Sequence, residues 1–396
     1  MTVGSMRAGV RPRLSVNFSA RDLVSYLSGD VLNGATDWPS GDRIAHLLTS
    51  GRGALYVLLK SLNLPPGSRV GVPLFVCEAV SEAVAHAGHR PVFLDVDPAT
   101  MVVSPLSVAD GPQLDALVAV HLFGNPVDVD SISGGGRLPV IEDCAHAIFS
   151  EFRGVQVGTR GAGAIYSFGL GKPISIGRLG AAVVSERANS DELTGIVRQM
   201  SGESASDIAY QAFRSFMISA LYRPPWYGTF SYRLGRTFEE SIDPMSHKTA
   251  EFRVSRGRLL SLIRSKIRDY RLRLRVQQEA WQTLSDILAD WSAIGLEPQE
   301  IQKGGISDRW LFAIRCRSLA QRDGLAAALL GVGIDSLKMY DRVPLIARSR
   351  YGYRGGASVA EELCHTVLAL PVASPDGTSD ATWLAPRLIE SMRGVR

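Results

Sequence analysis

The sequence predicts an α/β fold: a large domain with a mostly parallel sheet, and a smaller α+β domain after it. Between residues 69 and 185, short apolar runs alternate with stretches of helical periodicity, and this alternation builds parallel sheets. The last third instead gives a strand at 309–316, a helix at 321–334 and a strand at 337–340. With 396 residues, 45% of them apolar, the chain can fill two cores.

We expect three parts along the chain. Residues 1–44 are predicted to form an N-terminal arm, residues 45–265 the large domain, and residues 266–396 the small C-terminal domain. The large domain contains an insertion at about 190–250, where a helical stripe is followed by two prolines and a run of aromatic residues. The insertion is predicted to pack at the edge of a dimer or of the substrate site. A membrane-surface or partner-binding element is the alternative.

Net charge and cysteine spacing exclude several classes of partner and of site. A net charge of +4 does not predict a polyanion partner, and the four cysteines show neither CxxC nor metal-ligand spacing. We therefore expect a reduced, cytoplasmic protein without a disulfide framework, a metal site or a nucleic-acid partner. A basic stretch at 248–275 could meet nucleic acid, but a solvated helix face is the usual reason for such a pattern. No signal peptide and no membrane span are expected.

Two strands of the predicted sheet end in polar residues. The run at 139–141 is followed by Glu142 and Asp143, and the run at 164–168 leads through a glycine-rich turn to Lys172. Open α/β sheets bind ligands at the carboxyl ends of their strands. These acids and this lysine therefore mark the expected site.

Lys172 lies between Gly171 and Pro173. These uncharged neighbours would desolvate its amine. Such surroundings suit a Schiff-base lysine, whose amine must be unprotonated and rigidly held; the alternative is a lysine that points out of a loop. Asp143 favours the first interpretation, because pyridoxal phosphate (PLP) needs a carboxylate on its ring nitrogen. Ser167 could supply a hydroxyl for the phosphate.

A helix start upstream supplies a candidate phosphate site. Gly51, Arg52 and Gly53 precede a helical stripe over 54–62. Exposed N–H groups at a helix start bind anions. The alternative is a simple N-cap. Glycine fingerprints of dinucleotide and P-loop sites are incomplete around 161–174, so neither nucleotide site is expected.

The order of IEDCAHA, VG, YSFGLGK and AAVVS resembles the DegT/StrS family of PLP-dependent sugar aminotransferases. The resemblance implies that the large domain is aspartate aminotransferase-like. The resemblance spans roughly residues 45–390, apart from the insertion. It implies that Lys172 binds PLP covalently, Asp143 contacts the pyridine nitrogen and His146 lies near the ring hydroxyl. It also implies that Ser167 and the turn of Gly51, Arg52 and Gly53 hold the phosphate, with Arg52 in place of the family's threonine.

The resemblance implies three further positions. Phe75 corresponds best to an aromatic residue that stacks on the cofactor ring, although a plain core phenylalanine fits the local sequence nearly as well. Arg253 lies in a segment that reaches the neighbouring subunit's cofactor phosphate; Glu251 replaces the family's asparagine there. Tyr340 takes the place of a tyrosine after the second strand of the small domain. Arg253 and Tyr340 are expected to contact substrate.

The function that the resemblance implies is transamination of a nucleotide-linked keto sugar by a homodimer, with glutamate as the amino donor, in amino sugar, natural product or polysaccharide biosynthesis. One alternative is another PLP reaction, dehydration or lysis, on the same scaffold; the family's sugar dehydratases tend to carry histidine where this chain has Lys172. The other alternative is a regulatory or interaction protein that uses the basic helix.

Overall fold

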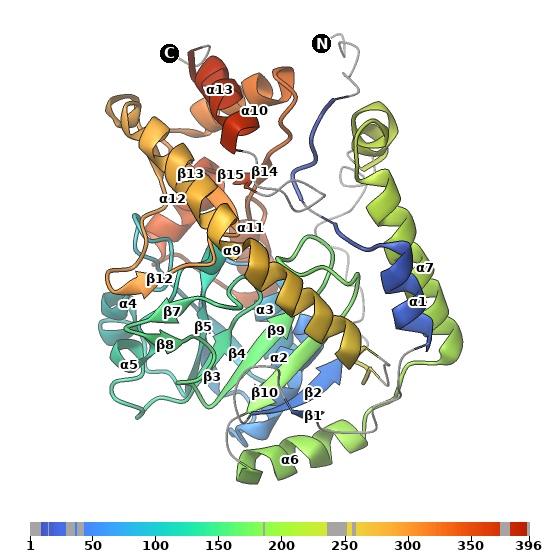
Figure 1. Ribbon diagram of the computed structural model, residues 1–396. Coiled ribbons are helices and arrows are strands. Elements are labelled where there is room, and N and C mark those ends of the chain that lie inside the picture. Colours follow the sequence, from blue (N-terminus) through green and yellow to red (C-terminus); the bar gives the residue numbers. More distant parts are fainter. Residues whose placement is uncertain are drawn as a thin grey trace.

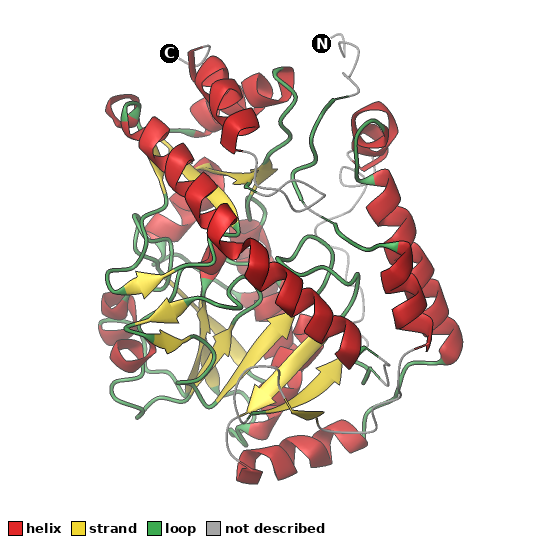
Figure 2. Cartoon of the chain, in the orientation of Figure 1, coloured by secondary structure: helices red, strands yellow, loops and turns green. Residues whose placement is uncertain are grey.

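The computed structural model describes residues 9–14, 16–28, 36–37, 43–184, 187–235, 252–255, 259–372 and 381–393. Its centre is an eight-stranded sheet of order β1-β2-β10-β9-β6-β5-β3-β4 (Figures 1 and 2). The strands from β9 to β4 run parallel to their neighbours, whereas β10 is antiparallel to both β9 and β2. The strands are β1 (Thr36–Asp37), β2 (Ile44–Leu48), β3 (Arg69–Pro73), β4 (Arg90–Leu94), β5 (Ala116–Val120), β6 (Val140–Asp143), β9 (Gly163–Ser167) and β10 (Gly180–Val184). The predicted α/β class is confirmed.

Alternate residues of the sheet enter two different cores. In β10, Ala182 and Val184 pack into the core that contains α2 and α3, while Ala181 and Val183 pack into the core that contains α9. This follows from the two-residue period of a strand. The sheet is thus covered on both faces, as a mostly parallel sheet requires. The helices are α2 (Gly51–Ser61), α3 (Ala79–His86) and α9 (Leu260–Ala289).

The small domain is an antiparallel sheet of order β11-β13-β15-β14 packed on helices. The predicted strands at 309–316 and 337–340 and the helix at 321–334 are found as β13, β14 and α10. A boundary between residues 265 and 266 falls inside α9, so the domain division stays a prediction. The elements are η3 (Ser292–Ile294), β11 (Leu296–Pro298), β13 (Leu311–Cys316), α10 (Leu319–Gly331), β14 (Leu337–Lys338), α11 (Val343–Tyr351), α12 (Ser358–Thr366), β15 (Val367–Pro371) and α13 (Ala381–Arg393).

The described part of the insertion is helical. The helix α7 lies beside α1 along one edge of the molecule (Figure 1), and the two helices contact each other. No helix of the described ranges is long and apolar enough to cross a membrane. The remaining elements are α1 (Ala20–Ser28), α4 (Pro105–Ala109), η1 (Leu122–Gly124), α5 (Val129–Ile132), β7 (Glu151–Phe152), β8 (Val155–Gln156), α6 (Arg187–Arg198), α7 (Ala205–Leu221), η2 (Tyr227–Ser231) and β12 (Gly305–Ile306).

Candidate active site

Four strands of the central sheet end at one edge. The strands β3, β6 and β9 belong to the parallel run. Strand β2 points the same way, because β2 and β9 both pair antiparallel with β10. Their carboxyl ends therefore bring together segments that lie far apart in the sequence. This edge is where open α/β sheets bind their ligands.

A cavity of about 410 Å³ opens at this edge. It has the volume of a small-molecule site. Five of the predicted site residues line it: Gly51, Arg52, Asp143, Ser167 and Lys172. The other lining residues are Ser50, Leu55, Cys77, Ala79, Val80, Ala145, Ile165, Arg178 and Phe252.

The two acids that end β6 point in opposite directions. Glu142 is buried, does not line the cavity, and accepts N–H groups from Gly158, Arg160 and Gly161 at 2.6–2.8 Å. His121 donates to Glu142 across 3.1 Å, since its other ring nitrogen accepts the N–H of Val127. These contacts hold the pKa of Glu142 below its usual value despite its burial. Glu142 and His121 thus have a structural role.

Asp143 is the acid that faces the cavity. Its Oδ1 accepts the N–H of Ala145 at 2.9 Å. Burial raises the pKa of the carboxyl group, and neither the N–H of Ala145 nor the charge of Lys172 cancels that effect. A cationic group in the cavity would favour the ionised carboxylate. A protonated pyridine nitrogen is such a group, so Asp143 fits the predicted contact with PLP.

Lys172 reaches back across the cavity to His146. The two side chains meet at 2.9 Å between Nζ and Nε2. The other ring nitrogen of His146, Nδ1, lies 3.3 Å from the N–H of Phe123 and accepts it. Burial lowers the pKa of His146 well below its usual value, so the ring is neutral and carries one hydrogen. With Nδ1 accepting, that hydrogen is on Nε2, the nitrogen that faces Nζ of Lys172.

The N-terminus of α2 forms the opposite wall. Ser50 is the N-cap and accepts the N–H of Gly53 through its hydroxyl, which leaves the N–H groups of the preceding residues at the mouth of the cavity. A Cβ on Gly51 would lie 2.9 Å from the Cβ of Ser167, and one on Gly180 would lie 2.3 Å from the carbonyl oxygen of Ser50. Glycine is required at both positions because the helix start is pressed against β9 and β10.

This wall has the properties of the predicted phosphate site. It combines a helix N-terminus with the hydroxyls of Ser50 and Ser167, and all three bind phosphate oxygens readily. Arg52 also lines the cavity, where its guanidinium pairs with Glu82 at 2.6 Å. A phosphate would therefore compete with a carboxylate for Arg52.

Phe75 does not line the cavity. It is 1% exposed, and its ring packs edge-on against Tyr340 and Phe123 with centroids 5.3 and 6.3 Å away. The residue two positions on, Cys77, lines the cavity instead. The structure thus corrects the prediction of a ring contact for Phe75, which lies within the wall. Tyr340 stands behind the same wall with a left-handed φ of 59°, and its substrate contact stays a prediction.

The segment expected to reach a partner subunit lies at the cavity mouth in this subunit. Phe252 lines the cavity and stacks on Tyr56, with centroids 4.4 Å apart and an interplanar angle of 11°. Arg253 instead pairs with Asp207 on α7 at 3.0 Å. Glu251 lies outside the described residues. The substrate role of Arg253 therefore stays a prediction.

Two residues of the site were missed by the sequence. Arg178, just before β10, brings a guanidinium to the cavity. Trp310 comes from the small domain; its ring centroid lies 4.4 Å from that of His146 and 6.0 Å from Nζ of Lys172. Neither follows a strand end of the large domain, so the spacing argument could not find them. Within the described residues, no group of three or more metal-ligating side chains is placed to hold a metal.

A parallel sheet with a lysine, an aspartate and a helix N-terminus around one cavity defines a protein of the aspartate aminotransferase fold. The model of the DegT/DnrJ/EryC1/StrS aminotransferase family matches residues 40–223. The match covers the cavity residues from Ser50 to Arg178.

One curated relative overlaps part of the chain. It is the UDP-N-acetyl-3-dehydro-alpha-D-glucosamine 3-aminotransferase of Acidithiobacillus ferrooxidans, which is 38% identical over 144 residues. The overlap covers 35% of this chain and 39% of that relative. The chain therefore matches less than half the length of this relative.

Solved structures share the fold over most of the chain. A sugar aminotransferase from Micromonospora echinospora gives a TM-score of 0.68 at 21% identity, covering 96% of this chain and 99% of that one. An E. coli GDP-4-keto-6-deoxy-D-mannose-3-dehydratase with bound hydrated PLP gives 0.65 at 18% identity, covering 89% and 87%. These identities show a common fold.

Proposed function

We propose that this protein is a PLP-dependent aminotransferase. The observation that carries the proposal is the meeting of Lys172, Asp143, Ser167 and the start of α2 on one cavity. These groups supply a primary amine, a carboxylate, a hydroxyl and a ready anion site. PLP requires the same set: an amine for its carbonyl, a carboxylate for its ring nitrogen, and a hydroxyl and an anion site for its phosphate.

Each residue has a defined task in that reaction. PLP, when bound, supplies a carbonyl that condenses with amines and a ring that delocalises negative charge. The start of α2 and Ser167 bind its phosphate, and Asp143 holds the proton of the ring nitrogen. Lys172 is the base whose Nζ moves a proton from the α-carbon of the amino donor. His146 orients that Nζ through its Nε2–H, at 2.9 Å.

The substrates follow from the cavity and from the curated relative. We propose a nucleotide-linked keto sugar as the acceptor, because the relative's name gives a UDP-linked dehydro sugar. Glutamate is the proposed donor, and Arg178 is a suitable partner for its carboxylate or for a nucleotide phosphate. A homodimer and a cytoplasmic location are part of the same proposal; they rest on the family resemblance and on the cysteine spacing.

A single-turnover assay tests the reaction class. Protein loaded with PLP and mixed with glutamate, without an acceptor, should release 2-oxoglutarate up to one equivalent per site. Adding a UDP-linked 3-keto sugar should then give the amino sugar and allow a second equivalent. Release of water from the sugar without 2-oxoglutarate would favour a dehydratase, and no reaction with any amine would favour the regulatory alternative.

A further inference from the structure

The helix α7 carries large apolar residues on its exposed side, although Ile208 and Phe216 already pack its other side against the core. On the buried side, the hydroxyl of Ser219 accepts the N–H of Phe18 and donates to the carbonyl of Val16. A surface helix normally turns mainly polar residues to solvent. The exposed apolar residues of α7 therefore need an explanation of their own.

The outer side continues beyond the end of α7. Three tyrosines of the next segment, Tyr222, Tyr227 and Tyr232, pack on one another, and the hydroxyl of Tyr227 donates to Asp335. Trp226 and Phe230, which lie between them in the sequence, are exposed. We call the exposed apolar residues of both stretches the α7 face; it consists of Tyr210, Phe213, Met217, Trp226, Phe230 and Leu234, each between 37% and 63% exposed.

The neighbouring helix α1 widens the apolar area. Val24 and Leu27 of α1 are also exposed, and α1 lies beside α7 along the same edge of the molecule (Figure 1). Isolated exposed apolar residues are common on proteins, whereas contiguous apolar areas mark interaction sites. The two helices thus present one such area.

Beyond the first turn of α7, where Asp207 pairs with Arg253, the charge of the described residues of this region has a single sign. Residues 208–235 contain three arginines, at 214, 223 and 233, and no aspartate or glutamate. On α1, Arg21 is exposed, whereas the one acid, Asp22, is buried and paired with Lys266 at 2.6 Å. The apolar area is therefore bordered by positive charge.

We propose that the α7 face docks on an anionic lipid surface. Aromatic and aliphatic residues bordered by arginine are the composition of interfacial helices, which lie in the headgroup region without crossing the bilayer. Tryptophan and tyrosine are preferred at that depth, and each arginine near an anionic leaflet adds attraction. The helix α7 alone, with 17 residues, is about 25 Å long.

A second copy of the chain fits the face less well. A two-fold interface brings the same surface of both subunits together, so the arginines of one copy would oppose those of the other. An acidic protein is a third occupant, but it would leave the exposed aromatic residues without a defined pocket. The lipid surface satisfies both the apolar area and the charge.

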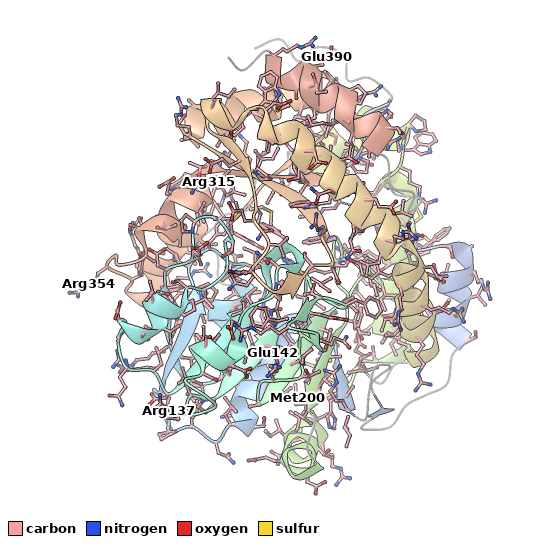
Figure 3. All side chains as sticks on the ribbon, turned by 60° about the vertical axis from the view of Figure 1, so that its left-hand side comes forward. Arg137, Glu142, Met200, Arg315, Arg354 and Glu390 are labelled. Atoms are coloured by element: carbon pink, nitrogen blue, oxygen red, sulfur yellow. The ribbon has the colours of Figure 1, made fainter. Side chains whose placement is uncertain are left out.

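Vesicle co-sedimentation tests the proposal with the full-length chain. We expect binding to vesicles of phosphatidylcholine mixed with phosphatidylglycerol, weaker binding at high salt, and little binding to phosphatidylcholine alone. Phe213→Ser combined with Trp226→Ser should lower the partition coefficient at least about tenfold, and Arg214→Glu several-fold. Leu106→Ser and Arg354→Glu are matched controls and should bind as the unmodified chain does. Arg354 projects from the edge opposite α1 (Figure 3).

Three outcomes would overturn the proposal. They are the absence of binding to the anionic vesicles, equal binding to phosphatidylcholine alone, and an equal loss in the controls. Sedimentation equilibrium without vesicles gives a further check. If the Phe213→Ser, Trp226→Ser variant lowers the oligomeric state, a second copy covers the face. Circular dichroism of each variant ensures that lost binding does not reflect lost folding.

Discussion

The amine of Lys172 lies 2.9 Å from Nε2 of His146, and the other nitrogen of that ring accepts the N–H of Phe123. Phe123 has a left-handed φ of 58°, which a non-glycine residue adopts only where the surroundings enforce it. The backbone at Phe123 therefore fixes the tautomer of His146. That tautomer in turn directs a hydrogen at the lysine amine.

Replacement of His146 should show whether this residue orients the amine of Lys172 or only packs against its neighbours. We expect His146→Leu to slow the first turnover roughly tenfold to a hundredfold, because Nζ of Lys172 loses the donor that orients it. His146→Gln, which keeps an N–H at similar reach, should recover much of that rate. Stopped-flow absorbance of PLP loading gives the same comparison without substrate. Equal rates in the two variants would mean that the histidine acts only by packing.

Replacement of Lys172 by alanine should abolish covalent binding of the cofactor. The unmodified protein with PLP should absorb near ~410–430 nm, as a protonated Schiff base does, and the variant should lack this band. Ser167 and the start of α2 would still bind the phosphate. Transamination should fall roughly a thousandfold or more. Borohydride reduction and peptide mapping locate the lysine; a label elsewhere would show that the site is misplaced.

Asp143→Asn should keep the covalent link and slow proton transfer. Asparagine has nearly the same shape but carries no negative charge, so the ring nitrogen loses the group that holds its proton. We expect the 410–430 nm band to persist and the single-turnover rate to fall roughly a hundredfold. Near-normal turnover in this variant would remove Asp143 from the mechanism.

Gly51→Ala should weaken PLP binding without unfolding the protein. The added Cβ would lie 2.9 Å from the Cβ of Ser167, so the start of α2 must shift away from the phosphate. The cost of such overpacking corresponds to an affinity loss of roughly tenfold or more. Gly195→Ala is the matched control, since nothing lies within 4 Å of a Cβ there. Fluorescence titration with PLP compares the two; equal affinities would argue against this phosphate site.

A buried histidine in β2 predicts a specific acid sensitivity. Burial lowers the pKa of His46 to about 4, below its value in an unfolded chain. The stability it contributes is fully present above about pH 6.5 and is lost as the pH falls towards 4. The loss is on the order of 3 kcal/mol across that window. Denaturant unfolding of His46→Phe at several pH values should show a shallower slope between pH 4 and 6.5, whatever its absolute stability.

The fold and most of the site followed from local patterns. Strand ends placed Asp143, Ser167 and Lys172 together, because carboxyl ends of parallel strands share an edge of the sheet. The same patterns could not show that Glu142 points away from Asp143's cavity, since that depends on which face of β6 each side chain takes. Strand geometry makes successive side chains alternate between the two faces of β6, but only the packed sheet shows which face each side chain takes.

The errors and omissions lie where the chain leaves regular structure. Phe75 and Cys77 both follow β3, and only the path of that turn decides which of them meets the cavity. Trp310 reaches His146 from the small domain, across more than 160 positions of sequence. Contacts of this kind depend on tertiary packing, which spacing along one segment does not encode.

The long helix α9 takes part in two cores at once. Its first half contributes Ile263 and Tyr270 to the core beneath the large sheet, and its second half contributes Trp281 and Leu284 to the core of the small domain. The helix has 30 residues and is about 45 Å long. Unfolding at its centre would therefore expose both cores. Melting of either domain should therefore carry the other with it, and calorimetry should show one cooperative transition instead of two.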